Sequence, residues 1–315
     1  MLPRFFAAFA LSLFALGTAS GQSVSTPATV DTIVARVAAE RENFISTFQN
    51  LTALETKSFT IFDRSGRVRK KRVVASNLII YRLSSSDDLV AEFRNVIAVD
   101  GKPLSDAAAR TTEFFAKLVK SETSRSEFDR IEDESLRYDP DIKISGLTLF
   151  QAIAVTENIR PSMRFSVKQA ADDSAHVLQL DFEQDAESAF IRVNRGSGPD
   201  PNKTSISFEI EGRENEPLNE RIRGILWIDA KSYQVVKEIR ETTVTPADFP
   251  LPVVISRTTS EYRSSEFGIL TPAKITQELF RLDRKRKIAV ADITAVFEYS
   301  AFTKPDVEVR SAEVK

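Results

Sequence analysis

Residues 288–302 read IAVADITAVFEYSAF, and the rest of the predicted fold is built around this strand signal. Alternate residues are apolar along its whole length, which is the pattern of a β-strand with one buried face. Together with the chain from residue 223 onward, it predicts four or five long antiparallel strands joined by tight turns. Strands of about a dozen residues are expected to twist and bend strongly. The apolar face consists of Ala289, Ala291, Ile293, Ala295, Phe297, Tyr299 and Ala301.

More strands are predicted on the N-terminal side of this stretch, where β-branched and aromatic residues gather between turn residues. Two loops rich in Gly, Pro and Asn, at 195–203 and 212–219, interrupt them. Neither half of the chain repeats the other, so we expect one continuous sheet with two exposed loops. The predicted strands are 58–63, 68–83, 89–99, 162–169, 175–183, 189–193 and 205–210.

Three segments have a helical period instead. In residues 27–54, 105–136 and 147–157 the apolar side chains recur every three or four positions. Their apolar faces need an opposing sheet. The sequence therefore predicts an α+β fold in which helices pack on the concave face of a strongly curved antiparallel sheet, a half-barrel. One domain, 22–315, is expected to contain all of it.

The N-terminus has the order of a secretory signal. Arg4 precedes an uncharged run, 5–16, and small residues follow up to Gly21. We expect residues 1–21 to be the signal peptide and the mature chain to begin at Gln22, with no transmembrane segment. The chain has no cysteine, so it lacks a site for lipid attachment and for disulfides. These features favour a bacterial protein exported to the periplasm or the exterior.

Charge excludes some partners. The 43 Lys and Arg residues nearly balance the 45 Asp and Glu residues, giving a formal net charge of -2. No overall basic field is present to hold nucleic acid or an anionic membrane. A local basic cluster, 67–72, is interpreted as a solvated turn or a protected edge strand.

Catalytic motifs are missing from the sequence. His176 is the only histidine, which excludes zinc held by several histidines, and no Gly-rich phosphate loop or Gly-x-Ser-x-Gly elbow occurs. We therefore expect neither a cofactor nor a metal, and no enzymatic activity. A hydrolase is the alternative, and it requires a carboxylate pair such as Asp181 and Glu183 to face one cleft.

A family resemblance adds to this interpretation. The segments 224–229 (GILWID), 233–238 (YQVVKE) and 268–275 (GILTPAKI), together with Tyr262 and Tyr299, resemble the closing strands of periplasmic lipoprotein-sorting (LolA/LolB-like) proteins. The turn 99–101 (VDG) also resembles larger exported relatives with this half-barrel. The resemblance implies a half-open barrel whose hydrophobic concave face, covered by helices, receives acyl chains in the carriers. This chain is more than about 100 residues longer than those carriers and has a long helical insert.

The function expected from these observations is a non-enzymatic carrier or sensor that binds an acyl chain, from a lipid or a lipoprotein, or another apolar ligand. The alternative is a structural or protein-interaction module of the bacterial envelope that has no small ligand. Its protein partner would use an edge strand or the basic turn 284–287. The residues expected to line the ligand site are Phe114, Phe115, Leu118, Phe150 and Ile153 on the helices, and Trp227, Phe297 and Tyr299 on the sheet.

Overall fold

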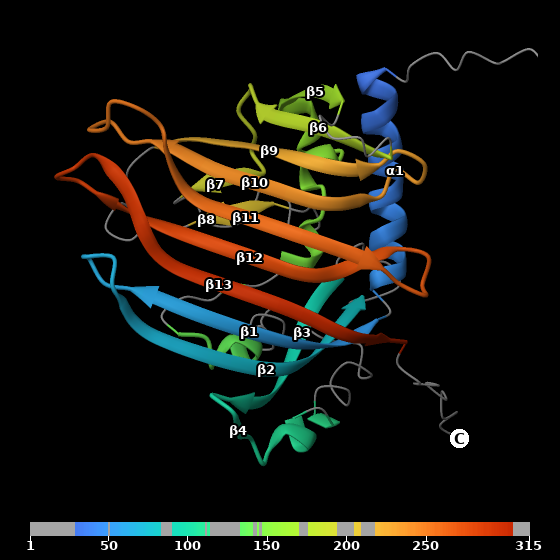
Figure 1. The fold of residues 1–315 in the computed structure, drawn as a ribbon, viewed down its shortest axis with the longest axis vertical. Coiled ribbons are helices and arrows are strands. Elements are labelled where there is room, and N and C mark those ends of the chain that lie inside the picture. Colours follow the sequence, from blue (N-terminus) through green and yellow to red (C-terminus); the bar gives the residue numbers. More distant parts are fainter. Residues whose placement is uncertain are drawn as a thin grey trace, which may run out of the picture.

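The computed structural model describes residues 29–49, 51–82, 90–110, 112–113, 133–140, 144, 147–169, 176–193, 205–208 and 218–304. Figure 1 shows one large sheet with a helix across one end of its strands. The elements in chain order are α1 (Val30–Phe48), β1 (Thr52–Phe62), β2 (Val68–Arg82), β3 (Val90–Val99), β4 (Lys102–Pro103), η1 (Leu147–Phe150), η2 (Ile153–Val155), η3 (Arg160–Ser162), β5 (Met163–Gln169), β6 (Val177–Gln184), β7 (Ile191–Val193), β8 (Ile206–Phe208), β9 (Asn219–Asp229), β10 (Val235–Thr245), β11 (Val253–Ser264), β12 (Leu270–Asp283) and β13 (Ile288–Thr303).

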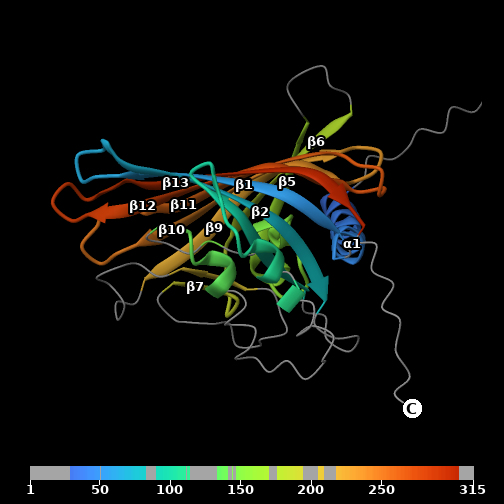
Figure 2. The ribbon, with the colours of Figure 1, turned by 90° about the horizontal axis from the view of Figure 1, so that it is seen from below.

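The predicted antiparallel sheet is confirmed. It has eleven strands in the order β4-β3-β2-β1-β13-β12-β11-β10-β9-β6-β5, and every neighbouring pair is antiparallel. Figure 2 shows that the sheet is curved. Its two outermost strands do not pair with each other, so the sheet stays open. Strands β7 and β8 form a separate parallel pair.

One face of the sheet, which we call the inner face, carries two apolar clusters. The first cluster lies on the side of β12, β13 and β1 to β3 and includes Phe59 and Phe297. The second lies on the side of β6 and β9 and includes Leu180 and Leu226. Helix α1 packs on both, because its first half contributes to the second cluster and Phe44 and Phe48 to the first. The helix thus bridges two regions of the inner face.

Two predicted helices differ from the structure. The helix predicted for 27–54 ends at Phe48, and β1 begins at Thr52. Buried and more exposed side chains alternate from that point, because β1 pairs with β13 on one side and with β2 on the other. The helix predicted for 147–157 is instead the short 3₁₀ turns η1 and η2, separated by Ala152 with a left-handed φ of 48°. Such a residue ends a helical run.

The described residues include only part of the remaining predicted helix and none of the predicted signal peptide. Within 105–136, residues 107–110, 112–113 and 133–136 are helical, and the rest lies outside the described residues. The predicted signal, 1–21, also lies outside them. None of the described helices has the length and apolar character needed to cross a bilayer. The predicted loop 212–219 ends earlier than expected, since β9 starts at Asn219.

Bulges change the apolar face of β13. Ile293, Ala295, Phe297 and Tyr299 are buried as predicted. On either side the register shifts, between Leu279 and Phe280 of β12 and between Thr52 and Leu54 of β1. An extra residue in one strand moves the following side chains to the other face. Ala291 and Ala301 are consequently exposed, and Phe302 packs against the first cluster.

Gly224 marks a close approach between strands, which predicts a strong effect of substitution. A Cβ atom at this position would lie 2.1 Å from the backbone oxygen of Ile239 and 2.5 Å from the Phe182 ring. Gly224→Ala should therefore lower the free energy of unfolding by about 2–3 kcal/mol through overpacking, as measured by urea denaturation. Because one obstacle is backbone, adding Phe182→Leu should restore only part of the loss. An unchanged denaturation midpoint for Gly224→Ala would contradict the predicted packing.

Candidate functional site

The predicted ligand-site residues do not share one surface. Phe114, Phe115 and Leu118 lie outside the described residues. Phe150 packs against both apolar clusters, whereas Ile153 belongs to the second and Phe297 and Tyr299 to the first. Trp227 lies on the opposite, outer face, since its neighbours Leu226 and Ile228 are the inward residues of β9. There the Lys237 ammonium lies 5.4 Å from the centroid of its ring.

A cluster of five charged side chains is buried on the inner face, and we call it the first ion cluster. Arg94 of β3 donates to both oxygens of Glu55 of β1, at 2.7 and 3.1 Å, and pairs with Glu92 at 2.7 Å. Lys57 of β1 pairs with Asp139 at 2.5 Å. All five side chains are almost completely shielded from solvent. Groups this deeply buried remain charged only when they are paired.

The electrostatics of the first ion cluster follow from burial and pairing. Burial alone would lower the pKa of Arg94, but the Glu55 and Glu92 carboxylates outweigh it and raise that pKa. Burial lowers the pKa of Lys57, and the positive charge of Arg94 adds to this. Burial also raises the pKa of Asp139, which Lys57 opposes. Arg94 is therefore the fixed positive centre of the cluster.

A second ion cluster consists of Arg41 of α1 and of Glu238 and Arg240 of β10. All three are buried, and Arg240 pairs with Glu238 at 2.9 Å. Burial raises the pKa of Glu238, and the positive charge of Arg240 opposes this. Burial also lowers the pKa of Arg41. Tyr262 belongs to the same region, because burial and the charge of Glu238 raise the pKa of its phenol.

The two ion clusters hold the backbone of residues 147–155, which we call the covering segment. Glu92 accepts from the Thr148 amide at 3.2 Å and also from the Thr148 hydroxyl, and Glu238 accepts from the Ala152 amide at 2.9 Å. Arg240 donates to the Phe150 carbonyl and Arg41 to the Gln151 carbonyl, each at 3.0 Å. Such charge-assisted bonds are stronger than neutral ones. Short 3₁₀ turns leave backbone groups unpaired, and here charged side chains satisfy them.

The inner face between the two apolar clusters is polar. On β10 to β12 it includes buried hydroxyl and amide side chains next to the charged Glu238 and Arg240. Gln277 links two of the hydroxyls by accepting from Thr258 at 2.5 Å and donating to Ser256 at 2.6 Å. The inner face is therefore two apolar regions with a polar strip between them, which the pattern of β13 alone did not indicate. The residues of the strip are Thr242, Ser256, Thr258, Ser260 and Gln277.

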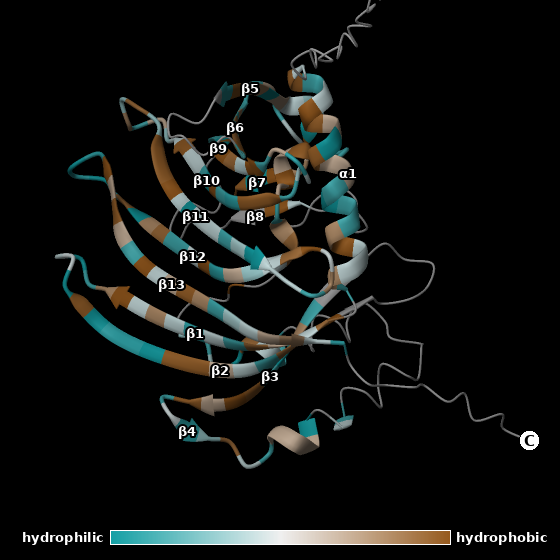
Figure 3. Cartoon of the chain, turned by 45° about the vertical axis from the view of Figure 1, so that its right-hand side comes forward, coloured by the Kyte–Doolittle hydropathy of each residue, from teal (hydrophilic) through white to brown (hydrophobic). Residues whose placement is uncertain are grey.

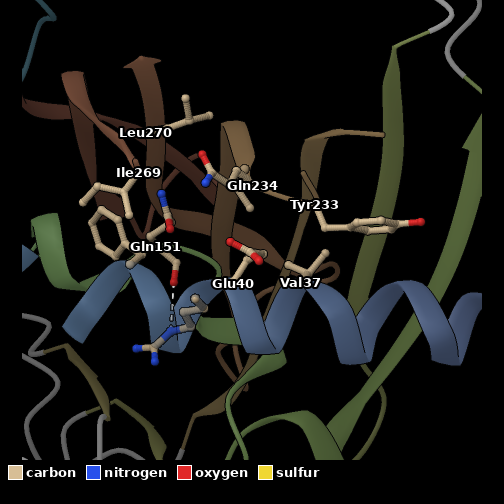
Figure 4. Close-up of a pocket in the computed structure, with 10 residues that line it drawn as sticks. Val37, Glu40, Gln151, Tyr233, Gln234, Ile269 and Leu270 are labelled. Atoms are coloured by element: carbon tan, nitrogen blue, oxygen red, sulfur yellow. Dashed lines mark hydrogen bonds between the residues drawn. The ribbon is translucent and has the colours of Figure 1, made fainter. Parts of the chain in front are cut away.

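A small pocket opens beside the second ion cluster (Figure 4). Its volume is about 10 Å³, roughly the space that one water molecule needs. The close-up shows α1 along one side of the pocket, with Val37 and Glu40 on the helix and Gln151 close to it. Arg41 of α1 donates to the Gln151 carbonyl at 3.0 Å. This space is far too small for an acyl chain while the covering segment stays in place. The pocket is lined by Val37, Glu40, Arg41, Phe44, Gln151, Tyr233, Gln234, Val235, Ile269 and Leu270.

The residues considered for catalysis lie elsewhere. Asp181 and Glu183 are on the outer face of β6, where they pair with Lys168 and Arg164 of β5. His176 is exposed in the turn before β6. Among the described residues, no three His, Cys, Asp or Glu side chains are arranged to hold a metal ion.

Sequence reasoning missed both ion clusters, although a signal was present. In β1 the inward positions are Ala53, Glu55, Lys57, Phe59 and Ile61, so two charges fall in phase with the buried residues. Leu54, between Ala53 and Glu55, is exposed. A charged residue at an inward strand position normally needs a buried partner. The phase of Glu55 and Lys57 therefore indicated a buried network, but not the identity of its partners.

Comparisons with known proteins give a limited result. No protein-family model matches the chain, and no curated protein matches its sequence. A crystal structure of a DUF1329 family protein from Desulfovibrio piger is similar with a TM-score of 0.34 and 11% sequence identity, over 91% of this chain and 97% of that chain.

Proposed function

We propose that the protein is an exported, non-enzymatic carrier or sensor that shelters an acyl chain or another apolar ligand beneath the covering segment. The position of Phe150 is the observation that supports this proposal. Its side chain packs against both apolar clusters, while its carbonyl accepts from Arg240. Movement of this one residue would open a path between two apolar regions that are separate in the closed form.

The way in which the covering segment is held supports a movable cover. Five of its backbone groups bond to charged side chains of β3, β10 and α1. Each such bond contributes about 1.5–3 kcal/mol net, because water can replace it when the segment lifts. Apolar packing of Ile153, Ala154 and Val155 adds to this. The cover is thus fastened by a few bonds that break and reform together.

The energetics allow an acyl ligand to bind. Burying about 14 methylene groups at ~0.8 kcal/mol each provides on the order of 11 kcal/mol, of which at least ~4 kcal/mol is lost to association. Opening the cover takes a further share, because the closed pocket has only about 10 Å³. A ligand that binds only the open form shifts the population toward it. About 7 kcal/mol then remains before the cover opens, a Kd of about 10 μM, so binding requires that water or the ligand replaces most of the bonds that hold the cover.

Tryptophan fluorescence gives a sharp test. The wild-type protein has one tryptophan, Trp227, on the outer face, so palmitate should leave its emission unchanged. In the double variant Phe150→Trp/Trp227→Phe the only tryptophan lies at the covering segment. We expect palmitate to shift its emission in a saturable manner, because the ring leaves or enters the apolar clusters. Organic extraction of the purified wild-type protein followed by mass spectrometry should recover lipid.

A second function is favoured by one observation, which is the tight filling of the inner face. Ile153 and Phe297 are fully buried, and the pocket beside the second ion cluster has a volume of only about 10 Å³. On this alternative the cover is permanent, and the protein is a structural or protein-interaction module of the envelope that offers an open sheet edge, β4 or β5, to a partner. Unchanged emission of the double variant at saturating palmitate, with no extractable lipid, would reject the carrier and support the module.

A further inference from the structure

Three loops gather at the end of the sheet opposite α1. They are the β1–β2 turn (63–67), the β10–β11 loop (246–252) and the β12–β13 turn (284–287). All three project from the left-hand end in Figure 1, and Figure 2 shows the same from below. The strand order explains this, because β1 pairs with β13, and β12 with β11. We call this surface the basic end.

Specific contacts join the three loops. Lys287 pairs with Asp248 at 2.8 Å, and its ammonium lies 5.5 Å from the centroid of the Phe249 ring. These contacts tie the β12–β13 turn to the β10–β11 loop. Arg281 of β12 donates to the Phe62 carbonyl at 3.4 Å, which ties the same hairpin to the β1–β2 turn. The basic end is therefore one surface built from three separate parts of the chain.

The basic end has a strong local excess of positive charge. Residues 62–73, 246–252 and 281–288 contain eleven Lys and Arg residues against three Asp, although the whole chain carries -2. Two of these carboxylates are used within the turns. Asp63 accepts from the Ser65 and Arg67 amides, and Asp283 from the Lys285 and Arg286 amides. The exposed cations are Arg64, Arg67, Arg69, Lys71, Arg284, Lys285 and Arg286.

Large apolar side chains are exposed among these cations. Leu251 is 70% exposed, Val68 51% and Ile288 44%, so each loop or its adjoining strand end contributes one. Figure 3 shows apolar and polar residues mixed at this end of the sheet. Leu251 lies in the β10–β11 loop, and Val68 and Ile288 are the first residues of β2 and β13.

Protection of an edge strand does not explain the whole surface. It accounts for residues 68–73 of β2, which lie beyond the part of β2 that pairs with β3. Lys and Arg there discourage pairing with another chain. It does not account for the β12–β13 turn, because both strands are central in the sheet. Cations mixed with protruding apolar side chains are instead the chemistry of an interface between water and an anionic bilayer.

We propose that the basic end docks onto an anionic lipid surface, where its Lys and Arg side chains bind headgroup phosphates and Leu251 and Ile288 insert among the headgroups. This inference does not depend on the proposed ligand beneath the covering segment, because the surface lies at the other end of the strands from α1. A protein partner with an acidic surface would use the same cations but would not need apolar tips on separate loops.

Vesicle co-sedimentation of the full chain tests the proposal. We expect binding to vesicles that mix phosphatidylethanolamine with phosphatidylglycerol, none to phosphatidylcholine vesicles, and release by high salt. Each cation near the surface contributes about fivefold, so Arg284→Gln/Lys285→Gln/Arg286→Gln, which removes three, should weaken binding by about a hundredfold. Leu251→Ser should weaken it by about fivefold through loss of insertion.

Matched controls lie at the other end of the strands. The triple variant Lys231→Gln/Lys274→Gln/Lys304→Gln removes three exposed cations there, and Leu54→Ser removes an exposed leucine. Both should bind as the wild type does. Failure of the wild type to bind anionic vesicles would overturn the proposal and leave an acidic protein as the partner. Sensitivity to the charge variant alone, with Leu251→Ser unaffected, would also overturn it as stated, since it would show adsorption without insertion.

Discussion

Replacing Arg94 by methionine should lower the free energy of unfolding by about 3–5 kcal/mol, because it leaves buried carboxylates without their cation. Arg94 is the common partner of Glu55 and Glu92. Methionine retains much of the volume of the arginine side chain, so the loss reports the charge rather than a cavity. Chemical denaturation monitored by circular dichroism measures the change.

Two comparisons make this result specific. Arg164→Met removes a cation from an exposed pair, in which Arg164 is 66% and Glu183 57% exposed, and should cost less than about 1 kcal/mol. Adding Glu55→Gln and Glu92→Gln to Arg94→Met should recover much of the loss, since no buried charge then remains unpaired. If Arg94→Met were as mild as Arg164→Met, the buried pairing would not be what stabilises this region.

The pair of Lys57 and Asp139 is expected to show an equally large effect with strong coupling. Lys57→Met leaves Asp139 buried and unpaired, and Asp139→Leu does the same to Lys57, so each should cost about 3–5 kcal/mol. The double variant should be close to the wild type in stability. The Asp139 carboxylate of the wild type supports this expectation, because its buried Oδ2 atom has no hydrogen-bond partner among the described residues. An imperfectly satisfied pair contributes little over an apolar one.

A double-mutant cycle measures this coupling directly. The four proteins are compared by urea denaturation under one set of conditions. A large favourable coupling, nearly equal to the sum of the two single losses, is the expected result. Strictly additive losses would show that the two side chains contribute independently, and the geometry of the pair at 2.5 Å would then have no energetic meaning.

Most of the fold could be predicted because alternation and turn residues are local signals. From residue 223 onward the sequence predicts four or five long antiparallel strands, and β9 to β13 are five such strands. The predictions failed where a local pattern fits two structures. Residues 52–54 continue the apolar period of α1, but pairing with β13 and β2, a long-range interaction, makes them a strand. Tertiary pairing overrides local propensity in such cases.

The site was much harder to predict than the fold. Phe150, Ile153, Phe297 and Tyr299 are inward residues, as their patterns indicate, but the sequence does not reveal that they belong to two clusters. The sequence analysis places Trp227 among the ligand-site residues of the sheet. Its phase in β9 places it on the outer face, since Leu226 and Ile228 point inward. The alternation of buried and less buried positions along β9 therefore locates Trp227 better than its hydrophobicity does.

Net charge also proved a poor guide to the surface. A total of -2 suggests a chain without electrostatic preference. The strand order brings two basic hairpins, far apart in sequence, to one end of the sheet. Sequence composition averages over such a patch, and only the pairing of β1 with β13 reveals it.

The pairing of β1 with β13 has a consequence for how the chain reaches its native state. The hydroxyls of Thr52 and Thr303 meet at 2.9 Å although 251 positions separate them. The N-terminal meander therefore has no permanent neighbour until synthesis of the last strand is complete. Closing so long a loop costs entropy before any contact is gained. We therefore expect folding to take roughly milliseconds to seconds, or longer. A ribosome-bound or truncated chain would expose β1 as an unprotected edge, where aggregation competes with folding.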